Sequence, residues 1–310
     1  MARKRGFEKT ASIFIAVLLK NLLLRLRYLP KNGAIVEVNK SKMLLCPKNG
    51  AIHMELFLNK KREILCTDHL MNDGIIKGGD VVLDIGANIG YYVLIESQLV
   101  GAKGKVYAVE PVRSNFELLK KNLRLNNLEN VDTFQLALGE HNEKSEIYVS
   151  NFSNLCSMDK NSVGGKIKGT QSVSEETVDL FLNNKLSPSL IRMDVEGYEY
   201  KIFGGMSKTL KGDLRVLAEL HPNYLSDERL NEIFQILRQN SFWVRFAVFE
   251  GKVDENKIVN KIVNSLLQKG GVTPSPTFVI ENVSLQKLQR VMKDYPEIAP
   301  NVLFEKQSCQ

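Results

Sequence analysis

The sequence predicts a doubly wound, Rossmann-like α/β fold with a mostly parallel sheet, preceded by an N-terminal accessory region. Short apolar runs alternate with segments of helical periodicity from Gly79 onward, which is the pattern of βαβ units. Several of these runs end in a carboxylate, and the first continues into the glycine-containing turn Asp84–Gly90. Because such folds bind ligands at the carboxyl ends of strands, the carboxylates indicate where a site lies.

Residues 1–78 are predicted to form the accessory region. Its basic N-terminus leads into the apolar run Ala11–Leu19, which Lys20 and Asn21 interrupt. A membrane-spanning helix needs about 20 apolar residues, so we expect a helix that either packs on the protein's own core or lies on a membrane surface. The hexapeptide Pro-Lys-Asn-Gly-Ala-Ile occurs at Pro30–Ile35 and again at Pro47–Ile52. Both copies are interpreted as turns that lead into strands. A helix over Ile64–Ile76 leads into the sheet.

The main domain is predicted over residues 79–295, followed by a C-terminal tail at 296–310. Helices are expected from Tyr91 and over Asn115–Leu125. The polar stretch Ser150–Gly169 is expected to be a mobile loop that binds substrate. An amphipathic segment, Asp254–Gln268, could cover a core edge, cover the site or form a dimer contact. Strands are expected at Asp80–Ile85, Lys105–Glu110, Val131–Leu138, Leu190–Asp194, Leu214–Leu220, Phe242–Phe249 and Thr277–Ile280.

Composition sets broad limits. The chain has 310 residues, of which 44% are hydrophobic and 25% charged, as is ordinary for globular proteins. The net charge of +7 suits an anionic partner, such as nucleic acid, an acidic membrane surface or a glycan, or simply reflects a lysine-rich surface. The four cysteines form no C-x-x-C pair, so neither a zinc nor a redox motif is indicated. A cytoplasmic location is expected, either free or at the membrane surface.

The turn after the first strand indicates the cofactor. A dinucleotide fingerprint reads G-x-G-x-x-G, whereas this turn reads D-x-G-x-x-x-G, with Asn88 where a diphosphate would favour glycine. S-adenosylmethionine therefore fits better than NAD. Asp84 would accept from the methionine ammonium, Asn88 would bind the carboxylate end, and Gly86 and Gly90 would let the turn approach the ligand. Glu110, twenty residues after Gly90 (110 − 90), would hold the ribose diol.

A second motif places Asp194, Glu196 and Glu199 at the end of the fourth strand. Carboxylates this close raise one another's pKa unless a cation intervenes. The sulfonium of S-adenosylmethionine is one such cation. A metal ion is another, but no histidine lies among them, so only an oxygen-ligand magnesium site would be plausible, and no metal ligand is assigned. Glu199 is expected to favour the N-terminus of the next helix.

His221 follows the fifth strand. A neutral imidazole there could take a hydroxyl proton. Alternatively, the residue could cap the following helix or pack under the segment Asp254–Gln268. The expected catalytic residues are Asp194 or His221 as the base, with Glu196 shaping the acceptor pocket.

Four blocks resemble the signature of the FkbM-type S-adenosylmethionine-dependent methyltransferases, in order and spacing. They are Val82–Tyr92, Val109–Pro111 with Asn115-Phe116, Ala137–Gly139 and Met193–Glu199. The resemblance implies a class I methyltransferase fold, seven-stranded with an antiparallel last strand, and methyl transfer to an oxygen, often a hydroxyl of a sugar or secondary metabolite. The cofactor-binding residues expected on these blocks are Asp84, Gly86, Ala87, Asn88, Gly90, Tyr91, Glu110, Pro111, Ala137 and Asp194.

Tyr198 stands where a small residue is common in that family, which would narrow the acceptor site. The acceptor class, a sugar, a glycan or a small metabolite, is what the family resemblance implies, and the sequence does not identify the acceptor within it.

Two alternatives remain. The basic charge favours an RNA methyltransferase, although the chain lacks an Asn/Asp-Pro-Pro-Tyr/Phe segment and a Pro-Cys nucleophile. A non-catalytic S-adenosylmethionine-binding module would not need acids at three strand ends. The oligomeric state is not predicted.

Overall fold

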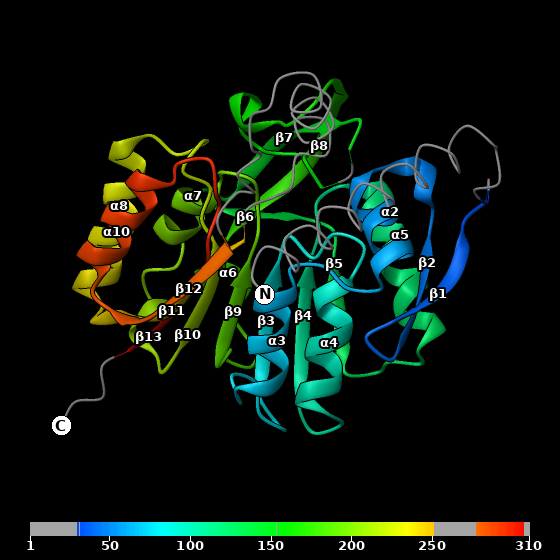
Figure 1. Ribbon diagram of the computed structural model, residues 1–310, viewed down its shortest axis with the longest axis horizontal. Coiled ribbons are helices and arrows are strands. Elements are labelled where there is room, and N and C mark those ends of the chain that lie inside the picture. Colours follow the sequence, from blue (N-terminus) through cyan, green and yellow to red (C-terminus); the bar gives the residue numbers. More distant parts are fainter. Residues whose placement is uncertain (1–29, 31, 153, 251–276, 307–310) are drawn as a thin grey trace, which may run out of the picture.

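The computed structural model describes residues 30, 32–152, 154–250 and 277–306, and it is built on one large eight-stranded sheet (Figure 1). In spatial order the strands are β12 (Thr277–Val283), β11 (Phe242–Glu250), β13 (Asn301–Lys306), β10 (Arg215–Glu219), β9 (Leu190–Met193), β3 (Val81–Ile85), β4 (Lys105–Val109) and β5 (Val131–Phe134). Strands β5, β4, β3, β9 and β10 are parallel. β13 is antiparallel to both of its neighbours, β10 and β11, and β12 pairs with the outer edge of β11.

Helices cover both faces of this sheet, as the doubly wound prediction requires. Neighbouring residues of one strand belong to different hydrophobic cores: Val82 packs in the core on one face of the sheet and Leu83 in the core on the other face. This double burial explains why the strands read as continuous apolar runs. The helices are α2 (Ala51–Asn59), α3 (Ile64–Asn72), α4 (Tyr91–Val100), α5 (Arg113–Leu125), α6 (Val178–Phe181), α7 (Glu199–Gly204), α8 (Asp227–Gln239) and α10 (Leu285–Asp294), with 3-10 turns at Pro47–Asn49, Lys160–Ser162 and Thr209–Lys211.

The last strand of the sheet corrects the predicted domain boundary. β13 lies between β10 and β11, although its residues were assigned to a C-terminal tail. Val302, Leu303 and Phe304 are completely buried, because both faces of the sheet are covered at this position. The antiparallel last strand implied by the family resemblance is thus β13. β12, which the prediction counted as the seventh strand, is an additional strand at the edge.

The predicted third strand, Val131–Leu138, is also divided. Its first half is β5 of the large sheet. Its second half, β6 (Ala137–Gly139), pairs with β8 (Ile167–Thr177) in a three-stranded sheet completed by β7 (Glu143–Ser150). The chain changes sheets here because Leu136 packs on the main core while Ala137 packs with Ile147 and Val173. In Figure 1 this small sheet lies above the large one. The predicted mobile loop is correspondingly shorter, since β8 begins at Ile167.

The accessory region contains a hairpin and two helices. The first hexapeptide leads into β1 (Ala34–Val38), which pairs with β2 (Ser41–Leu45). The second copy was predicted to lead into a strand but leads into α2. Val-Glu-Val follows the first copy and favours a strand, whereas His-Met-Glu-Leu-Phe-Leu follows the second and propagates a helix.

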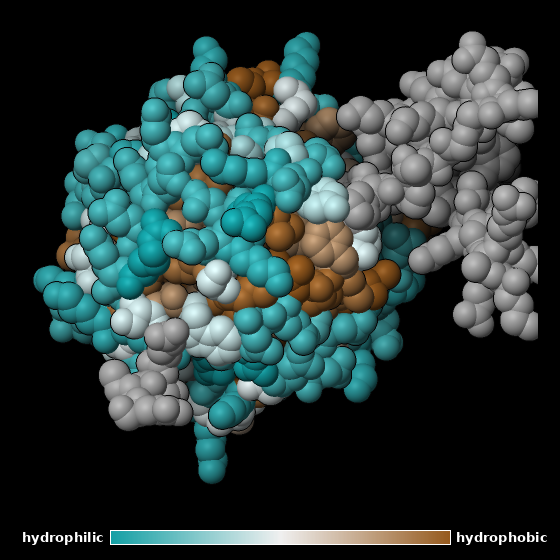
Figure 2. Space-filling model, turned by 60° about the vertical axis from the view of Figure 1, so that its left-hand side comes forward, coloured by the Kyte–Doolittle hydropathy of each residue, from teal (hydrophilic) through white to brown (hydrophobic). Residues whose placement is uncertain are grey.

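The predicted N-terminal helix, within residues 11–29, and the amphipathic segment 254–268 lie outside the described residues. Within the described ranges, no helix has the length and apolar character to cross a membrane. The face in Figure 2 is mainly hydrophilic around a smaller apolar area.

Candidate active site

A pocket opens at the carboxyl ends of β3, β4 and β9, where the strand order reverses. This is the topological switch point at which doubly wound folds bind ligands. The segment between β7 and β8, predicted as the substrate-binding loop, contributes Asn154, Cys156, Ser157 and Met158 to the wall. The pocket is also lined by Ile85, Gly86, Asn88, Val109, Glu110, Pro111, Val112, Asn115, Leu136, Ala137, Leu138, Ile147, Asp194, Val195, Glu196 and Tyr198.

The turn after β3 packs tightly against the turn after β9. A Cβ atom at Gly86, whose φ is +83°, would lie 2.1 Å from the backbone oxygen of Asp194, so only glycine fits there. Asn88 also has a positive φ, 50°, and its Oδ1 accepts the backbone N–H of Ile89 at 2.8 Å. Asparagine tolerates this conformation better than most residues. The backbone N–H of Asn88 is thereby turned toward Glu110.

Glu110 is held at the pocket wall by donors from three places. Its Oε2 accepts the N–H of Asn88 and its Oε1 that of Val112, both at 2.8 Å. The side chain of Asn115 donates a third hydrogen bond. Burial raises the pKa of the Glu110 carboxyl to about 7, although these donors oppose the rise. The carboxylate is therefore fixed in orientation, while its charge changes near neutral pH.

Asp84 lies behind the pocket rather than in its wall. It is completely buried, and its Oδ1 accepts from Nη1 of Arg192 at 3.0 Å. The guanidinium of Arg192 also stacks on the ring of Tyr92 at 3.7 Å and reaches Asp194 Oδ2 at 3.7 Å. Burial raises the pKa of the Asp84 carboxyl and Arg192 opposes this. Arg192 thus connects Asp84, which precedes the turn after β3, to Asp194, which begins the turn after β9.

The turn after β9 carries Asp194 and Glu196 into the pocket. Glu196 has a φ of 50°, an uncommon conformation for a non-glycine residue. Gly197 follows with a φ of +92°, and a Cβ atom there would lie 2.6 Å from Cβ of Tyr224. Ser157 Oγ donates to the backbone oxygen of Glu196 at 3.0 Å. Strained residues held by their surroundings cluster at functional sites.

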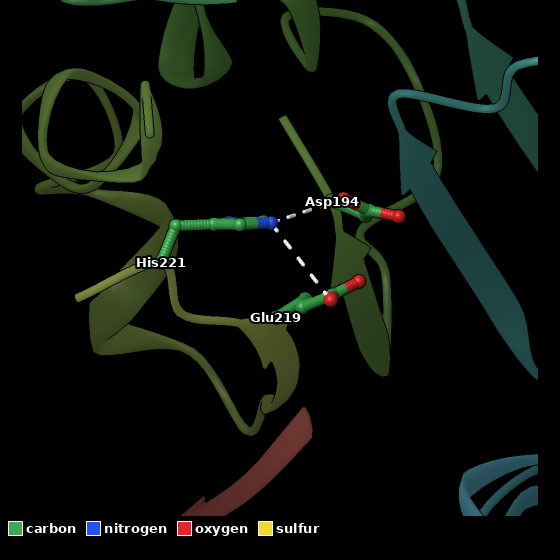
Figure 3. Close-up of side chains that lie close together, drawn as sticks. All are labelled: Asp194, Glu219 and His221. Carbon is green, nitrogen blue, oxygen red and sulfur yellow. Dashed lines mark ion pairs between the residues drawn. The ribbon is translucent and has the colours of Figure 1, made fainter. Parts of the chain in front are cut away.

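His221 lies near four carboxylates, of which Figure 3 shows those of Asp194 and Glu219. Its Nδ1 lies 2.7 Å from Oε1 of Glu199, while its Nε2 lies 3.4 Å from Glu196 Oε2 and 3.8 Å from Glu219 Oε1. Burial by itself lowers the pKa of His221, but these three carboxylates outweigh it and raise the pKa to about 10. The imidazole therefore holds a cationic charge at neutral pH.

The predicted site residues fall into two groups. Asn88, Gly86, Glu110, Pro111, Ala137, Asp194 and Glu196 line the pocket, whereas Asp84, Ala87, Gly90, Tyr91 and His221 do not. The hydroxyl of Tyr91 contacts Asn39, Arg62 and Thr67, and so connects α4 to the accessory region. Tyr198 lines the pocket, and its hydroxyl donates to Glu175 of β8 at 3.2 Å.

Sequence reasoning missed three residues of this site. Arg192 and Glu219 were assigned no role, and Glu199 was assigned only to a helix N-terminus. Glu199 does lie in the first turn of α7, but its carboxylate binds His221. One signal in the sequence could have found them. Two predicted strands have Arg192-Met193-Asp194 and Ala218–His221 at their ends, and neighbouring parallel strands such as β9 and β10 bring these ends to the same edge of the sheet.

Comparisons with known proteins agree on one class. Residues 84–244 match a family model described as the methyltransferase FkbM domain. A ribosomal protein L11 methyltransferase of Thermoanaerobacter sp. (strain X514) is 35% identical over 88 residues, which are 28% of this chain. The match spans only 27% of that relative's length.

Similar solved structures include methyltransferases of several kinds. A methyltransferase FkbM from Methylobacillus flagellatus KT has 19% identity and a TM-score of 0.37, over 51% of this chain and 37% of that one. A SAM-dependent O-methyltransferase from Thermotoga maritima has 15% identity and a TM-score of 0.41, over 90% and 79%. TYW2 from M. jannaschii in complex with AdoMet has 13% identity and a TM-score of 0.40, over 90% and 88%.

Proposed function

The chain belongs to the methyltransferase FkbM family, whose model covers just over half of it, and from this premise we propose that it methylates a hydroxyl oxygen of a sugar, glycan or small metabolite. The methyl donor is S-adenosylmethionine. The observation that carries the proposal is the position of Glu110, whose oriented carboxylate lies in the wall of a pocket at the switch point.

The pocket's donor set fits S-adenosylmethionine. A carboxylate at the end of the second parallel strand accepts hydrogen bonds from a ribose diol, and Glu110 is in that place. Apolar side chains of Val109, Leu138 and Ile147 line the same pocket and suit the faces of an adenine ring. The turn at Gly86 and Asn88 would hold the methionine end. Asp84 acts as a positioning residue in this proposal, because it holds Arg192 behind that turn.

Oxygen methylation needs a base and an aligned acceptor. S-adenosylmethionine supplies an electrophilic methyl group on a sulfonium. Asp194 and Glu196 line the pocket, and one of them takes the hydroxyl proton in this proposal. His221 is a positioning residue here, since an imidazole with a pKa of about 10 holds its proton at neutral pH. Alignment of the acceptor with the methyl group lowers the activation barrier by about 7–11 kcal/mol. A positioned base increases the rate by about 10²–10⁴-fold.

RNA is the second candidate acceptor, because the net charge of +7 favours binding to phosphates. The two candidates differ in a simple test. Turnover stimulated by transcripts, with binding that weakens steeply in salt, would favour RNA. Turnover on a panel of sugars and small alcohols, without stimulation by RNA, would favour the first proposal.

The cofactor half of the proposal is tested by calorimetric titration with S-adenosylmethionine and, separately, with NAD. We expect binding of S-adenosylmethionine alone, and a loss of about tenfold or more in Glu110→Gln, because one or two charged hydrogen bonds of roughly 1.5–3 kcal/mol each are weakened. Glu117→Gln, which changes a glutamate on the exposed side of α5, is the matched control. Equal affinity in Glu110→Gln, or preference for NAD, would contradict the proposal.

A further inference from the structure

The carboxyl ends of β9 and β10 bring together a histidine and two carboxylates that the methyl-transfer site leaves largely unexplained. Asp194, Glu219 and His221, here called the acid–histidine cluster, each direct one polar atom toward the others (Figure 3). His221 Nε2 lies 4.0 Å from Asp194 Oδ1 and 3.8 Å from Glu219 Oε1. The sequence alone did not suggest this arrangement, because His221 lies 27 positions after Asp194 (221 − 194).

The imidazole nitrogen at the centre is oriented but not hydrogen-bonded. His221 is only 4% exposed, and its Nε2 has no hydrogen-bond partner within the described part of the chain. On the other side of the ring, Nδ1 is bound by Glu199, which is completely buried and itself accepts the N–H of Gly197 at 3.1 Å. In metal sites, a carboxylate that accepts a hydrogen bond from one ring nitrogen of a histidine fixes the ring so that the other nitrogen can bind the ion.

The spacing of the three donor atoms is compatible with one ion. Two donors bonded at about 2.1 Å to the same ion are no more than about 4.2 Å apart, and both distances from His221 Nε2 are within that limit. All three atoms lie within 4.8 Å of one another, so a small rotation of the carboxylates completes the site. Glu196 Oε2, 3.4 Å from the same nitrogen, lies beside it.

The charge around the cluster favours a cation. Asp194, Glu196, Glu199 and Glu219 surround a single imidazole. The guanidinium of Arg192 lies 3.7 Å from Asp194, and that of Arg62 interacts electrostatically with Asp194 and Glu219, so four carboxylates face two guanidinium groups and one imidazole. A divalent ion would compensate more of this charge than a proton does.

We propose that Asp194, Glu219 and His221 bind a divalent transition-metal ion of the Mn²⁺ or Zn²⁺ type. One imidazole with carboxylates suits these ions better than Mg²⁺, which prefers oxygen ligands alone. Asp194 and Glu196 also line the cofactor pocket, so the ion lies at the pocket's edge. There it takes the acceptor's hydroxyl oxygen as a further ligand, a role that rests on the proposed function, whereas ion binding itself does not.

The ion would make the acceptor a better nucleophile. A metal-bound hydroxyl loses its proton more readily than a free one, and Glu196 takes that proton. The oxygen's electron pair then forms the new C–O bond, while the C–S bond of the sulfonium breaks and its electrons remain on sulfur. The products are a methyl ether, S-adenosylhomocysteine and a protonated Glu196, which returns its proton to solvent.

The test is a titration of the chelator-treated full chain with Mn²⁺, followed by electron paramagnetic resonance and calorimetry. We expect one Mn²⁺ per chain. We also expect the electron spin echo to be modulated by one coupled ¹⁴N nucleus, which reports the imidazole of His221. Glu219→Gln and His221→Ala should abolish this binding. Glu199→Gln should weaken it about 10–100-fold, because it supports the histidine from behind. His141→Ala, which removes an exposed histidine beside Glu140, is the matched control and should bind normally.

The wild-type titration decides the proposal even if a variant does not fold. Absence of stoichiometric binding, absence of the ¹⁴N coupling, or unchanged binding in both Glu219→Gln and His221→Ala would overturn it. S-adenosylmethionine affinity measured on the same samples separates the two proposals. Loss of Mn²⁺ binding with retained cofactor binding would refute only the metal site, whereas Mn²⁺ binding without cofactor binding would refute only the proposed function.

Discussion

At the scale of single residues, the proposed cofactor contact of Glu110 depends directly on the fold. Its carboxylate is oriented by two backbone N–H groups and one amide, and each of these comes from a segment next to a strand end. The position of Glu110 could be predicted from sequence, because it depends only on a strand, its length and an acid at its end. Its pKa could not, because that depends on how completely the surrounding segments bury it.

The raised pKa of Glu110 predicts how cofactor binding depends on pH. In the proposed complex the ionised carboxylate accepts both ribose hydroxyls, so binding to the protonated form must first release a proton. With a pKa of about 7, S-adenosylmethionine affinity should be constant above that pH and fall below it, by up to about tenfold per pH unit. Titrations of wild type and Glu110→Gln across this range check the prediction. Subtracting one pH profile of affinity from the other removes the contribution of the ligand's own ionisable groups. Parallel profiles for wild type and Glu110→Gln would refute the assignment of Glu110 to the ribose.

His221 illustrates the limit of sequence reasoning at this scale. A histidine after a strand was recognised as a candidate base, but its partners come from β9, from α7 and from its own strand. Glu199 and Glu219 are ordinary acids in the sequence. Only the parallel pairing of β9 with β10 brings them to the two nitrogens of one imidazole.

At the scale of elements, strands buried on both faces were recognised and irregular ones were not. β3, β4 and β9 were predicted nearly to their ends, because each is a mainly apolar run with an acid within its last residues or directly after it. β13 was missed because it is a short run near the end of the chain, and its role depends on partners more than fifty residues away. The two hexapeptides show the same point. Their sequences are identical, but one leads into β1 and the other into α2, because the residues after each copy differ.

The central place of β13 predicts the effect of truncation. A chain ending at residue 295 lacks the strand that pairs with both β10 and β11, and it exposes a large part of the core there. We expect this variant to lose cooperative thermal unfolding, as followed by circular dichroism. A chain ending at Lys306 keeps every paired residue of β13 and should unfold like the full chain. Cooperative unfolding of the shorter variant would show that β13 is dispensable.

At the scale of the whole molecule, the strand order explains why the two motifs form one site. The chain extends from β3 toward β5 on one side and then from β9 toward β13 on the other. The reversal leaves a pocket between them, with Glu110 on one wall and Asp194 and Glu196 on the other. The fold class and this location could be predicted from the sequence. The additional edge strand and the small sheet above the pocket could not, because both depend on pairing between distant segments.

The most direct test of this account is a crystal structure of the full chain with S-adenosylhomocysteine. We predict that both ribose hydroxyls lie about 2.5–3.0 Å from the Glu110 carboxylate, with the adenine between β4 and β6 and the sulfur facing Asp194 and Glu196. A nucleoside bound elsewhere, or a ribose without contact to Glu110, would contradict the central claim that this pocket holds the methyl donor.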